Sequence, residues 1–211
     1  MIPLYHDFSD ATVLVFGGGP VGARKARRFA REARVIVLSP AFADADFGDA
    51  RLVRAAPAPA DVAAWVERAA PALVVAATDD PAVNDAIAAA AGEEGALVNR
   101  ADEAGAREVG SVVVPATVRD GPVTVAVSTG GTSPALSGYL RERLTPTIEN
   151  AGAMAMLSGE LRAELREAGV DAERRRAALR AVVRSDRVWT GLDRGADKGR
   201  QVAEDVTGET P

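Results

Sequence analysis

Short apolar runs alternate with longer helix-forming segments through the first half of the chain. The runs are rich in valine and leucine and mostly too short for a helix, as expected for strands buried on both faces of a parallel sheet. They lie at 13–16, 35–38, 73–77 and 97–99, with a more polar candidate at 51–54. Segments at 23–33, 61–70 and 83–91 carry good helix formers between them. The alternation predicts an α/β fold with a doubly wound parallel sheet.

The pattern changes after Gly110. Apolar runs at 111–118 and 122–128 have no helix between them, and Asp120-Gly121 at their joint predicts a β-hairpin. A helix is predicted over 135–144, and apolar residues then recur at helical spacing over 148–183 with a break at Gly169. The residues from 193 onward are polar and lack a packing pattern, which predicts a disordered tail.

A glycine motif follows the first strand directly. Gly17, Gly19 and Gly22 have G-x-G-x-x-G spacing between a predicted strand and a predicted helix. In this setting the first glycine allows a tight turn, the second lets the backbone approach a pyrophosphate, and the third allows close packing of helix and strand. The motif predicts a dinucleotide bound at the helix N-terminus, in a Rossmann-type fold. A purely structural glycine turn is the alternative.

Polar residues follow two further strands. Ser39 stands where many NAD-binding folds have a carboxylate for the ribose, and the next carboxylates are Asp44 and Asp46. No arginine comes directly after this strand, which favours NAD over NADP. Thr78 and Asp79 follow the 73–77 strand, where they either contact the cofactor or cap the next helix.

A loop with two glycines and four hydroxyl residues precedes the 135–144 helix. Ser133 and Pro134 are suited to the N-cap and first helical positions. The remaining donors exceed what one cap needs, and they predict an anionic ligand held at the helix N-terminus. A glycine-rich linker is the alternative. The loop comprises Ser128, Thr129, Gly130, Gly131, Thr132 and Ser133.

Composition narrows the function further. The 211 residues include no cysteine and one histidine, so we expect no disulfide and no stable metal site. A net charge of −5 argues against general nucleic-acid binding. No apolar run has the length of a membrane span, and no signal-peptide pattern opens the sequence. We therefore expect a cytoplasmic protein that binds neither nucleic acid nor membrane.

Several sequence blocks together resemble the precorrin-2 dehydrogenase module of siroheme synthase. The glycine motif and strands alone would fit many Rossmann proteins. The block at 125–134 discriminates, because a Ser-Thr-Gly-Gly-Thr-Ser-Pro run after a hairpin is rare among them. The matching blocks are 15–21 with 24–26, Ser39-Pro40, 76–80, Asn99 with Asp102, and 125–134.

The resemblance implies a specific activity and organisation. The family oxidises precorrin-2 to sirohydrochlorin with NAD, and some members also insert ferrous iron to give siroheme. It forms homodimers, with the tetrapyrrole between domains. The implied division is an NAD-binding domain over 1–112, a dimerisation segment with the substrate loop over 113–147, a helical domain over 148–192 and the tail over 193–211. Whether this chain inserts iron stays open, as does a non-catalytic role in sensing nucleotides for a partner protein.

The resemblance also assigns site residues. Asp102 becomes the catalytic residue, suited to take a proton beside the nicotinamide. Arg100 departs from the family pattern, which usually has two apolar residues between the asparagine and the aspartate. It either binds a substrate carboxylate or perturbs Asp102. The substrate set is Arg100 with the 128–133 loop. The cofactor set is Gly17, Gly19, Pro20, Val21, Gly22, Ser39, Pro40, Thr78, Asp79 and Asn99.

Overall fold

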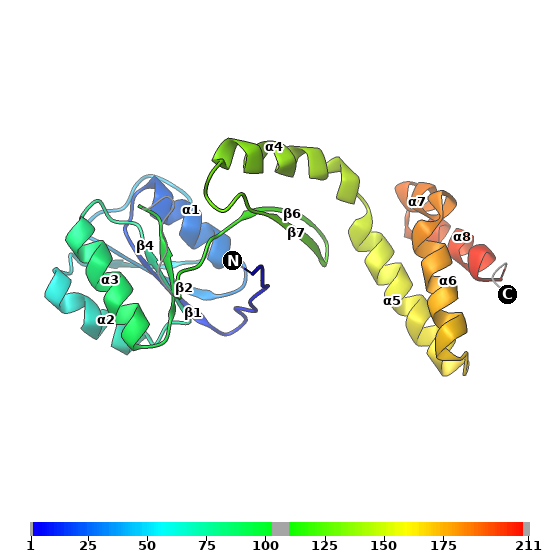
Figure 1. The fold of residues 1–211 in the computed structure, drawn as a ribbon, viewed down its shortest axis with the longest axis horizontal. Coiled ribbons are helices and arrows are strands. Elements are labelled where there is room, and N and C mark those ends of the chain that lie inside the picture. Colours follow the sequence, from blue (N-terminus) through cyan, green and yellow to red (C-terminus); the bar gives the residue numbers. More distant parts are fainter. Residues whose placement is uncertain (1, 103–109, 209–211) are drawn as a thin grey trace. The chain divides into compact units, whose positions relative to one another are not determined.

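The chain forms two compact units with separate hydrophobic cores (Figure 1). The structure is a computed structural model and describes residues 2–102 and 110–208. The first unit comprises residues 1–114 with 130–132, and the second comprises 115–129 with 133–211.

A five-stranded parallel sheet forms the centre of the first unit, in the order β3-β2-β1-β4-β5. Each predicted strand is present, and the fold class is confirmed. The strands are β1 (Thr12–Phe16), β2 (Arg34–Ser39), β3 (Arg51–Arg54), β4 (Leu73–Ala76) and β5 (Leu97–Arg100).

Helices cover both faces of this sheet. Val13 and Val15 of β1 pack with α1 (Pro20–Phe29) on one face. Leu14 and Phe16 pack on the other face with α2 and α3, so alternate residues of one strand are buried on opposite sides. The helices of that face are α2 (Val62–Ala69), preceded by the short 3-10 helix η1 (Pro59–Asp61), and α3 (Pro81–Glu93).

Three of the element boundaries that differ from the sequence prediction are instructive. Helix α1 begins at Pro20, because proline is suited to the first helical position. Helix α3 continues through Gly92 to Glu93, because a glycine costs a helix only about 1 kcal/mol. Ser111 does not begin a hairpin strand. It forms an isolated parallel bridge with Val98 and so lies along β5.

The second unit joins a hairpin to a helical bundle. Strands β6 and β7 pair in antiparallel fashion, with Asp120 opposite Val123. Met154, Leu161, Val182 and Val188 are among the buried residues of the bundle. The elements are β6 (Ala116–Asp120), β7 (Val123–Val127), α4 (Pro134–Leu144), η2 (Pro146–Ile148), α5 (Ala151–Glu167), α6 (Ala172–Arg184), α7 (Asp186–Asp193) and α8 (Ala196–Gly208).

Residues 196–208 of the expected disordered tail instead form helix α8. Gly199, Ala203 and Val206 are buried, at helical spacing along one face. Arg200 forms ion pairs with Glu160 of α5, at 3.1 Å, and with Glu164. Because this buried face consists mainly of small residues, the polar average composition of the segment does not reveal it. None of the helices that the structure describes has the length and hydrophobicity needed to span a bilayer.

Candidate active site

The glycine loop after β1 has the geometry that its sequence predicts. Gly17 has φ +117°, and a Cβ there would overlap the carbonyl oxygen of Ala77. A Cβ on Gly22 would overlap the carbonyl oxygen of Gly17, so helix α1 packs directly on the turn. A Cβ on Gly19, in contrast, would have no neighbour within 4 Å. The fold itself therefore requires glycine at positions 17 and 22, whereas Gly19 borders open space.

The N-terminus of α1 is suited to bind an anion. Gly19 is its N-cap residue and supplies no side-chain cap, and Pro20 occupies the first turn. The N–H groups of the first turn therefore keep their capacity to bind a phosphate, and the helix dipole adds positive potential. These residues fit the pyrophosphate of a dinucleotide.

Ser39, at the carboxyl end of β2, lies beside this loop. Its side chain is buried, and a Cβ on Gly18 would come within 2.7 Å of the Ser39 Cβ. Arg54, the last residue of β3, is the register partner of Ser39. The structure therefore brings Ser39 and the glycine loop together, as expected for the ribose end of the cofactor site.

The loop after β4 is fixed by Asn84 of α3. The Thr78 hydroxyl donates to Asn84 Oδ1 at 2.7 Å, and Asn84 Nδ2 donates to the Thr78 carbonyl at 3.0 Å. Neither Thr78 nor Asp79 caps the helix. The cap is Asp80, whose Oδ1 accepts from Ala82 N at 2.9 Å. Cofactor contact by Thr78 and Asp79 stays a prediction.

Asp102 lies just beyond β5 and is held by side chains from two elements. Arg100 donates to it through Nε, at 2.9 Å to Oδ1, and through NH2, at 2.8 Å to Oδ2. Asn84 Nδ2 donates to Oδ2 at 3.0 Å. Arg100 NH1 also donates to Asp85 of α3 at 2.9 Å. Asp102 thus shares one network with the loop after β4.

The Arg100 guanidinium holds the pKa of Asp102 below its ordinary value, and the Asn84 amide acts in the same direction. Burial opposes them, but more weakly. Asp102 is therefore a carboxylate at neutral pH and can accept a proton. The sequence analysis missed Asn84 and Asp85. The sequence signal for them was a pair of polar residues near the start of an otherwise alanine-rich helix, which follows a loop predicted to contact the cofactor.

Asn99 and Ser111 present buried oxygens that lack a hydrogen-bond partner. Asn99 is 5% exposed, and its Nδ2 donates to the carbonyl of Val112 at 2.8 Å. Within the described ranges, neither Asn99 Oδ1 nor Ser111 Oγ has a partner. Both residues line a cavity of about 310 Å³, together with Val21 and Lys25. Buried acceptors of this kind are normally satisfied, so they fit a ligand that donates hydrogen bonds, such as a carboxamide.

Lys25 contributes an unusual cation to this cavity. Burial, reinforced by the neighbouring charges of Arg28 and Arg24, lowers the pKa of Lys25 to about 8. Its ammonium is therefore easily deprotonated for a lysine, and it can act as a hydrogen-bond donor in this cavity, which Arg24 and Arg100 also line.

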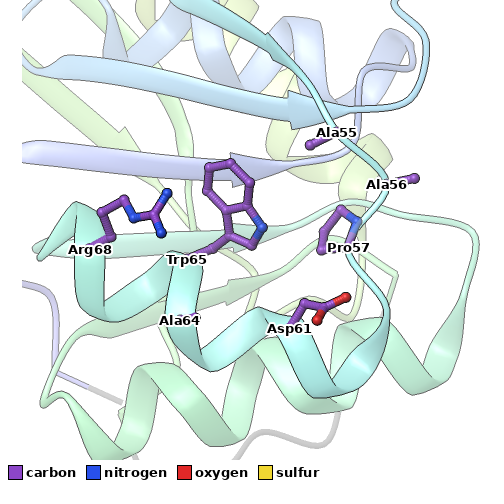
Figure 2. A pocket seen from close by; sticks show the side chains of 7 residues that line it. All are labelled: Ala55, Ala56, Pro57, Asp61, Ala64, Trp65 and Arg68. Atoms are coloured by element: carbon purple, nitrogen blue, oxygen red, sulfur yellow. The ribbon is translucent and has the colours of Figure 1, made fainter.

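A second hollow lies between α2 and the segment that follows β3, with a volume of about 360 Å³. Figure 2 shows the Trp65 ring rising from α2 between Arg68 and Pro57. The Arg68 guanidinium lies 5.5 Å from the centre of the Trp65 ring. The residues predicted to bind cofactor or substrate do not line this hollow.

The hydroxyl-rich loop joins β7 to α4. The Ser133 side chain caps α4 by accepting from Leu136 N at 3.3 Å, as predicted. The Thr129 hydroxyl donates to the Ser133 carbonyl at 3.0 Å and lies 3.1 Å from the Ser137 hydroxyl. Gly130 and Gly131 both have positive φ. Binding of substrate by this loop stays a prediction.

The parallel sheet and its glycine loop define a dinucleotide-binding Rossmann protein. Comparison with known proteins agrees. Residues 4–116 match the family described as "Putative NAD(P)-binding", and residues 120–145 match "Sirohaem biosynthesis protein central". The solved structure "SirC, precorrin-2 dehydrogenase" has the same fold, with a TM-score of 0.71 and 24% identity over 97% of this chain and 100% of that one.

Curated relatives give the family. "Precorrin-2 dehydrogenase" of Methanosarcina barkeri (strain Fusaro / DSM 804) is 32% identical over 96% of this chain and 91% of its own. "Siroheme synthase" of Stutzerimonas stutzeri (strain A1501) is 32% identical over 100% of this chain and 45% of its own. The chain belongs to the precorrin-2 dehydrogenase family, and it spans about half the length of the siroheme synthases that it matches.

Proposed function

We propose that this chain oxidises precorrin-2 to sirohydrochlorin, with NAD as the hydride acceptor. The observation that carries the proposal is that Asp102, an ionised carboxylate, follows the carboxyl end of β5. The glycine motif follows the carboxyl end of β1, at the same edge of the parallel sheet. Ligands of open α/β sheets bind outside this edge. The Methanosarcina relative matches this chain over nearly the whole length of both proteins, and its name, precorrin-2 dehydrogenase, supports the same reaction.

The net reaction removes a hydride and a proton from the substrate and yields NADH. The nicotinamide, when bound, accepts the hydride. The proton goes to the Asp102 carboxylate, which hydrogen bonds keep charged and oriented before substrate arrives. Asn84 and Arg100 thus contribute by holding the base rather than by reacting.

In this proposal, residues of the first unit would hold the cofactor. The glycine loop and the N-terminus of α1 would hold the pyrophosphate, and Ser39 with Pro40 would border the ribose. Asn99 Oδ1, a buried acceptor, would hold the nicotinamide carboxamide. No arginine directly follows β2 in the sequence, which supports NAD over its phosphorylated form.

In this proposal, the 128–133 loop binds the substrate and helix α4 contributes to dimerisation. A tetrapyrrole with several carboxylates is suited to the hydroxyl and N–H donors of the 128–133 loop at the N-terminus of α4. Helix α4 also exposes Leu136, Tyr139 and Leu140 at helical spacing, which supports burial against a second copy of the chain.

An anaerobic assay with purified protein, NAD and precorrin-2 tests the function. NADH and sirohydrochlorin are expected in equal amounts. Asp102→Ala should bind NADH as the wild type does but lose at least about a hundredfold in turnover. Absence of turnover in the folded wild type would refute the function, and full activity of Asp102→Ala would refute the role of that residue. Adding ferrous iron to the same assay tests insertion of the metal.

A further inference from the structure

Arg100 has a side-chain environment that differs from that of its neighbour on β5. Asn99 lies on the face of the sheet that α1 covers, as Leu97 does, whereas Arg100 lies on the α3 face, as Val98 does. The Arg100 side chain extends along the carboxylate of Asp102. The Arg100 side chain is 15% exposed, compared with 26% for Asp102 and 71% for Asp85. A guanidinium so enclosed and bound to two carboxylates has one well-defined orientation.

We propose that Arg100 is a positioning residue for catalysis: its guanidinium fork, anchored through NH1 to Asp85 of α3, holds the Asp102 carboxylate as an oriented anion. The inference rests on the proposed function, in which Asp102 accepts the proton. It resolves the two roles that the sequence leaves open for Arg100 in favour of the one directed at Asp102.

The contacts explain how the fork acts. Two parallel hydrogen bonds from one planar group fix the rotation of a carboxylate, which a single bond does not do. Asn84 adds a third donor from α3, so the carboxylate is held from two elements. A base held in this way needs no reorientation when substrate binds, and loss of about 1 Å in placement can cost about a hundredfold in rate.

The fork also has a cost for catalysis. A cation beside a carboxylate stabilises the charged form and so weakens it as a base. Among the described residues, the groups in contact with Asp102 are Arg100 and the neutral Asn84, and Asp85 lies behind Arg100. The sequence also has Glu103, Arg107 and Glu108 in the stretch outside the described residues. The observed arrangement therefore favours orientation and ionisation over intrinsic basicity.

The pH dependence of kcat/KM in full-length variants tests the proposal. Arg100→Leu should move the acidic limb to higher pH, because the group that lowers the pKa of Asp102 is gone. Its kcat at the plateau should fall about tenfold while KM for precorrin-2 stays within about threefold. Arg100→Lys keeps the charge without the fork and should restore the limb but not all of kcat.

Two further variants separate this role from a general effect. Asp85→Asn removes the anchor and should shift the limb less than Arg100→Leu does. Arg68→Leu removes an arginine of the same unit that lies against Trp65, and it should leave rate and profile unchanged. An unshifted acidic limb in Arg100→Leu overturns the proposal. A raised KM with unchanged kcat also overturns it, because that result assigns Arg100 to the substrate.

A measurement without substrate keeps the test independent of the proposed function. The carboxyl 13C resonance of Asp102, assigned by its loss in Asp102→Asn, should titrate at higher pH in folded Arg100→Leu than in the wild type. Equal titration in both proteins overturns the role of Arg100 even if the wild type oxidises precorrin-2. If the wild type does not turn over, the function fails, and the titration still shows whether Arg100 controls Asp102.

Discussion

Replacing Asn84 by alanine should lower the free energy of unfolding of the first unit by about 3 kcal/mol. The Asn84 side chain is 1% exposed and makes four hydrogen bonds, three with Thr78 and one with Asp102. Each bond contributes about 1 kcal/mol net. Part of the total of about 4 kcal/mol is recovered, because Thr78 and Asp102 are not fully buried and can bind water instead.

Urea unfolding followed by tryptophan fluorescence measures this change. The chain has two tryptophans, Trp65 on α2 in the first unit (Figure 2) and Trp189 on α7 in the second. A Trp189→Phe background therefore makes the signal report on the first unit alone. Asp85→Ala is the matched control on the next residue of α3. Its side chain is mostly exposed and forms an ion pair with Arg100 within the described part of the chain, so its removal should cost no more than about 0.5 kcal/mol.

This experiment shows whether the hydrogen bonds of Asn84 stabilise the fold. If Asn84→Ala costs less than about 1 kcal/mol, or no more than Asp85→Ala, the hydrogen bonds of Asn84 do not hold the loop after β4. If Asn84→Ala costs about 3 kcal/mol, as expected, the stability of that loop is linked to the placement of Asp102, because the Asn84 amide bonds to both.

Other variants test the cofactor site. The free energy of unfolding of the wild type should rise between pH 8 and the ordinary lysine pKa of 10.5, because the unfolded chain binds more protons than the folded chain in this range. Lys25→Met should lack this rise and should be about 1–2 kcal/mol more stable than the wild type at neutral pH. Urea titrations at several pH values measure both effects. Gly19→Val should have the same urea midpoint as the wild type but bind NADH at least about tenfold more weakly. Gly22→Ala should lower the free energy of unfolding by at least about 2 kcal/mol, because its Cβ overlaps the Gly17 carbonyl. Ser39→Asp should raise the preference for NAD over NADP, measured as a ratio of kcat/KM, by at least about tenfold through repulsion of the 2′-phosphate.

Most of the first unit was predictable because its determinants are local. The buried runs of β1, β2 and β4 leave no polar face for solvent, and this pattern is specific to a covered parallel sheet. The glycine spacing adds the turn and the direction of the first helix. Errors occurred where local rules are weak. Gly92 lies inside α3, and α8 forms where an average over polar residues hides a narrow stripe of small ones.

The hydrogen-bond network of the site was not predictable in this way. Asn84 and Asp102 are 18 positions apart, and their contact depends on how α3 is rotated about its axis. That rotation follows from packing of Val83 and Ile87 into the core below the helix. The amphipathic pattern of an alanine-rich helix is shallow, because alanine suits either face, so the sequence determines the rotation poorly.

For Arg100, the sequence predicts the face of the sheet on which the side chain lies but not the group that it binds. Residues alternate between the faces of a strand, so Arg100 must face away from Asn99, toward the helix on the other side of the sheet. Position alone therefore separates the two side chains and places Arg100 on the side of α3. The sequence does not give the partner, because a substrate carboxylate and Asp102 are equally good acceptors for a guanidinium. In the structure the acceptor is Asp102: Asp85 of α3 accepts from Nη1, and Nε and Nη2 are thereby aligned with the carboxylate two residues along the chain.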